Sequence, residues 1–234
     1  MKIAKNNMLD KLDKILLYFV ELDESIPFDQ YSDLLSLLSK EKQEQIQKFH
    51  FEVDKKLSLL SDVLVRYVAC NLLGVSNVDL LFQKNEYGKP HLVGIDNFHY
   101  NISHTRNAFV VGVSKETIGV DIEKIRECEM KIANRFFTTE EVQYIKKGDK
   151  EVSKRFYEIW TKKEAYIKWR GKGLSIPLDS FNVVSNTLLC EFWSIQKTGY
   201  QIAVCHRIDD IGNVIEFEEK ELFEIIENSA NAFK

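Results

Sequence analysis

A long amphipathic helix followed by apolar strands is expected twice along this chain, and this order limits the fold more than any other feature. Apolar residues recur at helical spacing over 57–73, just before Gly74, and again over 153–170. Apolar strands are expected after the two helices, over residues 98–103, 108–114, 181–184, 190–195 and 201–206. Because helices and strands alternate irregularly, without repeated βαβ units, the pattern predicts an α+β fold. The segments AFVVGVS and YQIAVCH give the two halves a weak internal similarity.

Shorter signals add elements around these segments. A strand is expected over 15–22 and a Leu-rich helix over 31–38. Ser39 is a typical N-cap residue, and Thr138 with Glu141 three positions later forms a capping box. Further helices are therefore expected to begin just after Ser39 and Thr138.

Charge is unevenly distributed along the 234 residues. The chain has 32 Lys and Arg against 36 Asp and Glu, a formal net charge of −4. Residues 209–227 hold eight acids and one lysine, which leaves a net charge of about +3 on the rest. This balance argues against a partner that is nucleic acid, and it is compatible with a local anion site.

The cysteines and the apolar runs favour a cytoplasmic protein with reduced thiols. None of the four cysteines forms a C-x-x-C pair, so a zinc site is not expected. No apolar run approaches the roughly 18 residues of a membrane span, so no membrane partner is expected. The apolar run over 15–20 is followed by Glu21, which is typical of a strand rather than of a signal peptide.

Two carboxylates occupy one face of the alternating segment IGVDIE (118–123). Ile118, Val120 and Ile122 share one face of a strand, while Asp121 and Glu123 share the other. Carboxylate oxygens at this spacing suit Mg²⁺, which takes hard oxygen ligands. The same pattern is also typical of the solvated face of an edge strand, and the spacing alone does not decide between them.

A second candidate lies on the helix over 153–170. Glu164 and Lys168 lie one helical turn apart, which is the spacing of a surface ion pair. Five basic residues lie within 161–172, and Gly171 and Gly173 then end the helix. A phosphate-binding helix end and a solvated charged face both fit this pattern.

Two further candidates lie at strand ends and turns. His104 follows Asn101, Ile102 and Ser103 at the end of a strand. There it either donates a hydrogen bond to a phosphate or is simply a turn residue. Lys89 stands between Gly88 and Pro90, where it is either a positioned cation or part of a simple tight turn.

Four blocks in this order resemble the 4′-phosphopantetheinyl transferases of the surfactin-synthetase-activating type. They are YGKP (87–90), FHYNISH (98–104), IGVDIE (118–123) and WTKKEAYIKWRGKGLS (160–175). The last has the pattern W-x-x-K-E-x-x-x-K followed by a Gly-rich turn, which is the most specific. The resemblance implies a pseudo-twofold pair of similar α+β subdomains in one chain, residues 1–117 and 118–234, with the active site in the cleft between them.

The resemblance implies a metal-dependent transfer. The phosphopantetheine arm of coenzyme A moves to a carrier-protein serine and 3′,5′-ADP leaves. Asp121, Glu123 and Glu164 match the Mg²⁺ ligands, and Lys168 matches a catalytic lysine on the pyrophosphate. The base is either Glu164 or a metal-bound water, and His104 is a further catalytic candidate.

The coenzyme A contacts implied by the resemblance come from both halves. Gln45 stands where the family often has another basic residue, which weakens the expected 3′-phosphate site. The matching residues are Lys42, Lys48, Ser58, Lys89, Ser103, His104, Lys163 and Lys168.

The implied partner is an acidic, helical acyl or peptidyl carrier protein. The segment after Glu123 is its expected dock, with Ile132, Phe136 and Phe137 as apolar contacts or core residues. A monomer is expected, because one chain holds both halves. The surfactin-type resemblance favours nonribosomal peptide, antibiotic or polyketide biosynthesis. The alternatives are another Mg²⁺-dependent phosphotransferase acting on a nucleotide diphosphate and a non-catalytic module that binds coenzyme A or the carrier.

Overall fold

The computed structural model describes residue 12 and residues 14–148, 150–207 and 211–233. The strands are β1 Ile15–Glu21, β2 Phe82–Lys84, β3 Pro90–Leu92, β4 His99–Thr105, β5 Ala108–Ser114, β6 Gly119–Lys124, β7 Glu191–Lys197, β8 Tyr200–His206 and β9 Ile211–Glu218. The α-helices are α1 Lys40–Gln47, α2 Glu52–Leu73, α3 Met130–Phe136, α4 Thr139–Ile145, α5 Val152–Arg170 and α6 Glu219–Phe233. Short 3₁₀ helices span Phe28–Leu37, Asn77–Asp79, Gly173–Ser175 and Leu178–Ser180.

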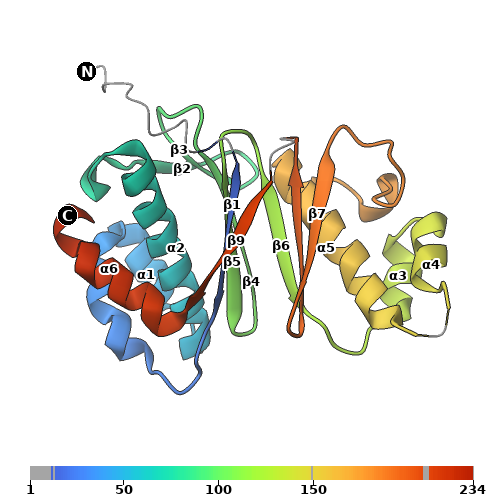
Figure 1. Ribbon diagram of the computed structural model, residues 1–234, viewed down its shortest axis with the longest axis horizontal. Helices are drawn as coiled ribbons and strands as arrows, with labels where there is room; N and C mark the ends of the chain where they lie inside the picture. Colours follow the sequence, from blue (N-terminus) through green and yellow to red (C-terminus); the bar gives the residue numbers. More distant parts are fainter. Residues whose placement is uncertain (1–11, 13, 149, 208–210, 234) are drawn as a thin grey trace.

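Two sheets lie face to face at the centre, with helices covering their outer sides (Figure 1). One sheet has the strand order β4-β5-β1-β9, and the other has the order β6-β8-β7. Apolar residues from both sheets form the core between them, among them Leu17, Val110, Val120 and Ile202. Helices α1, α2 and α6 cover the first sheet, and α3, α4 and α5 lie beyond the second. This arrangement confirms the predicted α+β class with two subdomains.

Most of the predicted elements are present. Helix α2 ends at Gly74, which takes a left-handed backbone conformation, with φ of 66°. Ser39 caps α1, and Thr138 and Glu141 form the complete capping box of α4. The segment expected as a helix over 31–38 is instead part of the 3₁₀ helix Phe28–Leu37. The strand expected over 181–184 is wrong, because those residues have no strand pairing.

The last strand and helix lie with the first half of the chain. Strand β9 runs parallel to β1, with Leu17 opposite Val214, and Leu222 of α6 is part of the core that contains α2. Of the acidic residues of the tail that the structure describes, Glu219 is buried, and the exposed ones are Glu216, Glu218, Glu221, Glu224 and Glu227. The division at residues 117/118 stays a prediction.

A buried ion pair fastens α6 to this core. The Lys56 ammonium lies 2.9 Å from a Glu219 carboxylate oxygen, and the two side chains are only 2% and 1% exposed. The same ammonium donates to the carbonyl oxygens of Asp23 (2.7 Å) and Ile26 (2.9 Å). The other Glu219 oxygen accepts the backbone N–H of Asp23. Loop 22–27, α2 and α6 therefore meet at one charged centre.

Replacing Lys56 with methionine is expected to lower the free energy of unfolding by about 3–5 kcal/mol, because Glu219 then stays buried without its cation. Urea denaturation followed by circular dichroism measures this. The double variant Lys56→Met, Glu219→Leu removes both charges, and we expect it to regain only part of the loss, because the Asp23 N–H and the Asp23 and Ile26 carbonyls still lose their partners. Equal stability of the single variant and the wild type would contradict this role.

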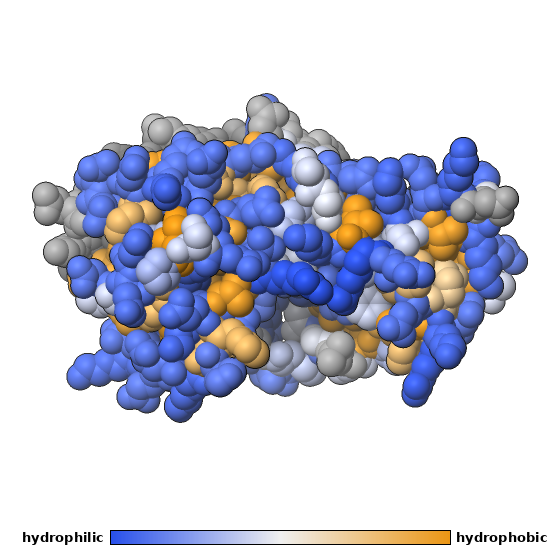
Figure 2. All heavy atoms as spheres, turned by 90° about the horizontal axis from the view of Figure 1, so that it is seen from below, coloured by the Kyte–Doolittle hydropathy of each residue, from blue (hydrophilic) through white to orange (hydrophobic). Residues whose placement is uncertain are grey.

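The surface in Figure 2 is mostly hydrophilic, with apolar residues in separate patches. Among the helices that the structure describes, none combines the length and the apolar character of a membrane span.

Candidate active site

Strand β6 directs its two carboxylates toward α5. Val120 and Ile122 point into the core between the sheets, so Asp121 and Glu123 face the opposite way. Gly119 lets the helix approach, since a Cβ atom there would overlap the backbone of Ala165 and Trp169. The close approach of strand and helix places the β6 carboxylates beside the polar side of α5.

Asp121, Ser103 and Lys168 form a hydrogen-bonded triangle between the halves. The Lys168 ammonium lies 2.7 Å from Asp121 Oδ1 and donates to Ser103 Oγ at 2.8 Å. Ser103 Oγ donates to the same Oδ1 at 2.9 Å. Asp121 is buried, whereas the Lys168 side chain keeps 27% of its exposure. These three predicted site residues are therefore brought together.

Alternate side chains of β4 hold β6 in place. Asn101 Oδ1 accepts the Val120 N–H at 2.8 Å, and Thr105 Oγ1 donates to Glu123 Oε2 at 3.2 Å. Ser103 stands between Asn101 and Thr105 on the same face of β4. The sequence analysis did not assign a role to Asn101 or Thr105, although their alternation with Ser103 along the strand is a signal that finds them.

The three predicted metal ligands share one electrostatic environment. Burial raises the pKa of Asp121, while the Lys168 ammonium and the hydrogen bonds to the carboxylate oppose this rise. Burial, followed by the negative charge of Asp121, raises the pKa of both Glu123 and Glu164. Glu123 and Glu164 therefore each lie within electrostatic reach of Asp121, and a cation beside Asp121 would relieve this repulsion.

The donor atoms fit a divalent cation. Asp121 Oδ2 is buried and has no hydrogen-bond partner among the described residues. Carboxylate oxygens are the donors that Mg²⁺ prefers. Within the described part of the chain, no group of three or more Asp, Glu, His or Cys side chains is yet arranged to hold a metal. Oδ1 of Asp121 is instead bound to Lys168.

Of the predicted coenzyme A contacts of the first half, His104 lies beside this triangle. His104 follows Ser103 on β4 and has an exposed side chain. Desolvation, followed by the positive charge of Lys168, lowers the pKa of His104, and Lys42 acts in the same direction. Lys42 itself lies 2.9 Å from an Asp62 carboxylate oxygen. Lys48 is exposed, and Ser58 is half-buried on α2.

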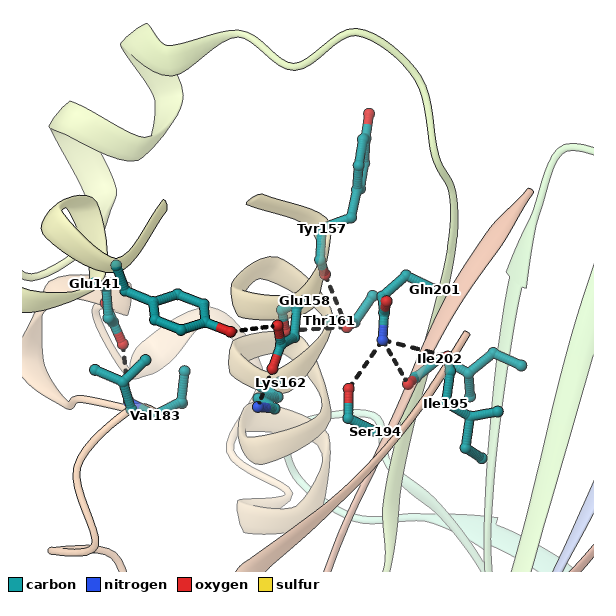
Figure 3. Close-up of polar contacts among 12 residues, drawn as sticks. Glu141, Tyr157, Glu158, Thr161, Lys162, Val183, Ser194, Ile195, Gln201 and Ile202 are labelled. Carbon is teal, nitrogen blue, oxygen red and sulfur yellow. Dashed lines mark hydrogen bonds and ion pairs between the residues drawn. The ribbon is translucent and has the colours of Figure 1, made fainter. Parts of the chain in front are cut away.

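Lys163 is not brought into this site. Its side chain is fully buried, and its ammonium lies 2.8 Å from a Glu141 oxygen. It also donates to the carbonyls of Leu178 (2.6 Å) and Phe181 (2.7 Å). Glu141 accepts the Val183 N–H as well, as Figure 3 shows. Lys163 therefore joins α4, α5 and segment 178–183, and a contact of Lys163 with coenzyme A stays a prediction that this geometry does not favour.

The other basic side chains within 161–172 point in different directions around α5. Lys162 pairs with Glu158, which accepts from Tyr144 as well (Figure 3). Arg170 donates to the Tyr166 hydroxyl. Because successive helical residues point about 100° apart, the basic run does not form one phosphate-binding face.

Known proteins match most of the chain. The profile of the 4′-phosphopantetheinyl transferase superfamily matches residues 117–213, and that of the 4′-phosphopantetheinyl transferase N-terminal region matches residues 27–117. The chain is 37% identical over 168 residues to the 4′-phosphopantetheinyl transferase Sfp of Bacillus subtilis, covering 71% of this chain and 75% of that protein. It is 34% identical over 213 residues to the 4′-phosphopantetheinyl transferase gsp of Aneurinibacillus migulanus, covering 86% and 89%.

The chain belongs to the 4′-phosphopantetheinyl transferase superfamily. This phosphopantetheinyl transferase is therefore an enzyme that uses coenzyme A as a substrate and transfers phosphopantetheine to carrier proteins. The two profiles meet at residue 117, just before β6, so the Asp121–Ser103–Lys168 triangle joins residues from both matched regions.

Proposed function

We propose that the enzyme catalyses a Mg²⁺-dependent transfer of 4′-phosphopantetheine from coenzyme A to a serine of an acyl or peptidyl carrier protein, with release of 3′,5′-ADP. The serine oxygen forms a bond to the β-phosphorus, and the bond from that phosphorus to the leaving 3′,5′-ADP oxygen breaks. The observation that supports this site is the buried Asp121 Oδ2, which has no hydrogen-bond partner in the described part of the chain and lies beside a lysine that contacts both halves.

Asp121, Glu123 and Glu164 would hold the cation, and the effect of the Asp121 charge on the pKa of both glutamates supports this grouping. When bound, Mg²⁺ supplies positive charge that neutralises the pyrophosphate. Thr105 orients the Glu123 carboxylate through its hydrogen bond. Ser103 does the same for Asp121 Oδ1.

Lys168 stabilises the charge that develops on the pyrophosphate, because its ammonium is already oriented and partly open to solvent. Either Glu164 or a water at the cation site takes the proton of the carrier serine. Burial and the Asp121 charge raise the pKa of Glu164 in the protein without a bound cation. His104, Lys42, Lys48 and Ser58 bind coenzyme A phosphates.

The carrier protein docks after β6, at residues 125–137. Phe136 is 38% exposed and is available to a partner, whereas Phe137 is buried in the core beneath α3. Ile132 is half-buried. We propose an acidic, helical carrier and a cytoplasmic enzyme. We also propose that the enzyme is a monomer, because one chain supplies both sides of the site.

The test is mass spectrometry of purified apo-carrier proteins from nonribosomal peptide, polyketide and fatty-acid synthesis, each incubated with the enzyme, coenzyme A and Mg²⁺. We expect a phosphopantetheine mass gain on the carrier serine and none on a Ser→Ala carrier. No gain on any carrier, together with hydrolysis of other nucleotide diphosphates, would favour the alternative phosphotransferase.

A further inference from the structure

The turn between β2 and β3 reaches from the first half of the chain to the C-terminal end of α5. Within the turn, Asn85 Oδ1 accepts the N–H groups of Tyr87 and Lys89, both at 2.9 Å. Asn85 Nδ2 is thereby left to donate to the carbonyl oxygen of Gly171, also at 2.9 Å. Its contact with Gly171 crosses 86 positions of the chain.

The Lys89 ammonium lies where helix and strand converge. It donates to the carbonyl oxygens of Lys168 (2.7 Å) and Ile118 (2.9 Å), and more weakly to that of Trp169 (3.4 Å). Its three N–H bonds are thus all directed at protein carbonyls. Burial lowers the pKa of Lys89 to about 8, as expected for a cation held by neutral groups.

These contacts satisfy the end of α5. The last carbonyl groups of a helix have no partner within it, and the helix dipole favours a cation there. Gly171 takes a left-handed conformation with φ of 64°, and a Cβ atom on it would lie 3.2 Å from the Lys89 stem. The turn therefore fits tightly against the helix end.

We propose that Lys89 and Asn85 form a latch that positions the catalytic helix α5 against β6, and that Lys89 is a positioning residue rather than a ligand of coenzyme A. Lys89 binds the backbone of Lys168, whose side chain contacts Asp121, and also the backbone of Ile118, which directly precedes β6. The latch rests on the proposed roles of Lys168 and Asp121.

The test compares Lys89→Met with Lys84→Met. Lys84 is exposed on β2 of the same hairpin, so the control makes the same charge change without touching α5. Amide hydrogen exchange at residues 168–172 reports the latch itself. Turnover at saturating coenzyme A measures the effect of the latch on catalysis, and calorimetry measures its effect on the binding of coenzyme A.

We expect Lys89→Met to speed exchange at the helix end and to lower kcat about 10- to 100-fold, because a misplacement of about 1 Å costs about that much. The Kd of coenzyme A should change by less than about 2-fold, since the interaction acts on the transition state rather than on binding. The Lys84→Met control should match the wild type in all three measurements.

A second variant, Asn85→Asp, keeps the proposal testable if Lys89→Met fails to fold. Asn85→Asp keeps the acceptor oxygen of the turn and replaces only the donor to Gly171, so it should give the same pattern with a smaller loss. Unchanged exchange, unchanged kcat despite faster exchange, or a loss confined to coenzyme A affinity would each overturn the latch. If the wild type transfers nothing to any carrier, the proposed function fails, and exchange alone then decides the latch.

Discussion

Asp121→Asn is expected to lower transfer to the carrier protein by roughly 1,000-fold or more, because it removes the charge on which a bound cation depends. Coenzyme A binding should weaken far less, since the proposed phosphate contacts of Lys42, Lys48 and His104 remain. Turnover measured by carrier mass gain, together with calorimetric binding of coenzyme A, separates the two effects.

The same substitution should leave the fold intact. Burial raises the pKa of the Asp121 carboxyl, so its ionised form opposes folding near neutral pH, and a neutral amide removes this cost. Lys168 loses its carboxylate partner but keeps its hydrogen bond to Ser103 Oγ and stays partly solvated. We expect a thermal midpoint equal to or above that of the wild type, and Asp79→Asn, at the exposed end of the 3₁₀ helix Asn77–Asp79, serves as the control. Transfer retained by Asp121→Asn would rule out the metal assignment.

Gly119→Ala is expected to cost about 1–3 kcal/mol of stability or more, because the new methyl group has no space against α5. Its Cβ would meet the backbone of Ala165 and Trp169, which cannot move aside as a flexible side chain does. The helix must shift away from β6, and transfer should fall about 100-fold in the fraction that stays folded. Denaturation midpoints and turnover of the folded protein measure the two effects.

Gly94→Ala is the control for this change. Gly94 has a positive φ of 78° but nothing within 4 Å of the added Cβ, so only backbone strain of about 1–2 kcal/mol is introduced. Transfer by its folded fraction should equal that of the wild type. If Gly119→Ala behaves like Gly94→Ala, the close approach of α5 is not needed for activity.

The sequence predicted those parts of the site that depend on local periodicity. The alternation over 118–123 placed Asp121 and Glu123 on one face, and the helical spacing placed Glu164 above Lys168. Capping residues located the starts of α1 and α4. These features depend on neighbours within a few positions, which is why they can be read from the chain itself.

Long-range pairing was not predictable in the same way. The acidic composition of the tail did not indicate β9 and α6. Their position in the fold depends on the pairing of β9 with β1 and on the buried Lys56–Glu219 pair. Lys163 and Lys168 look equivalent in the sequence, yet one is fully buried with Glu141 and the other faces Asp121. Their different roles depend on what packs against each side of α5.

The most direct test of the cation site is calorimetric titration of Mg²⁺ into metal-free enzyme saturated with coenzyme A, compared with Asp121→Asn under the same conditions. The site described here predicts saturable Mg²⁺ binding by the wild type and loss of that binding in the variant. Equal Mg²⁺ binding by the two proteins, or none by the wild type, would contradict it.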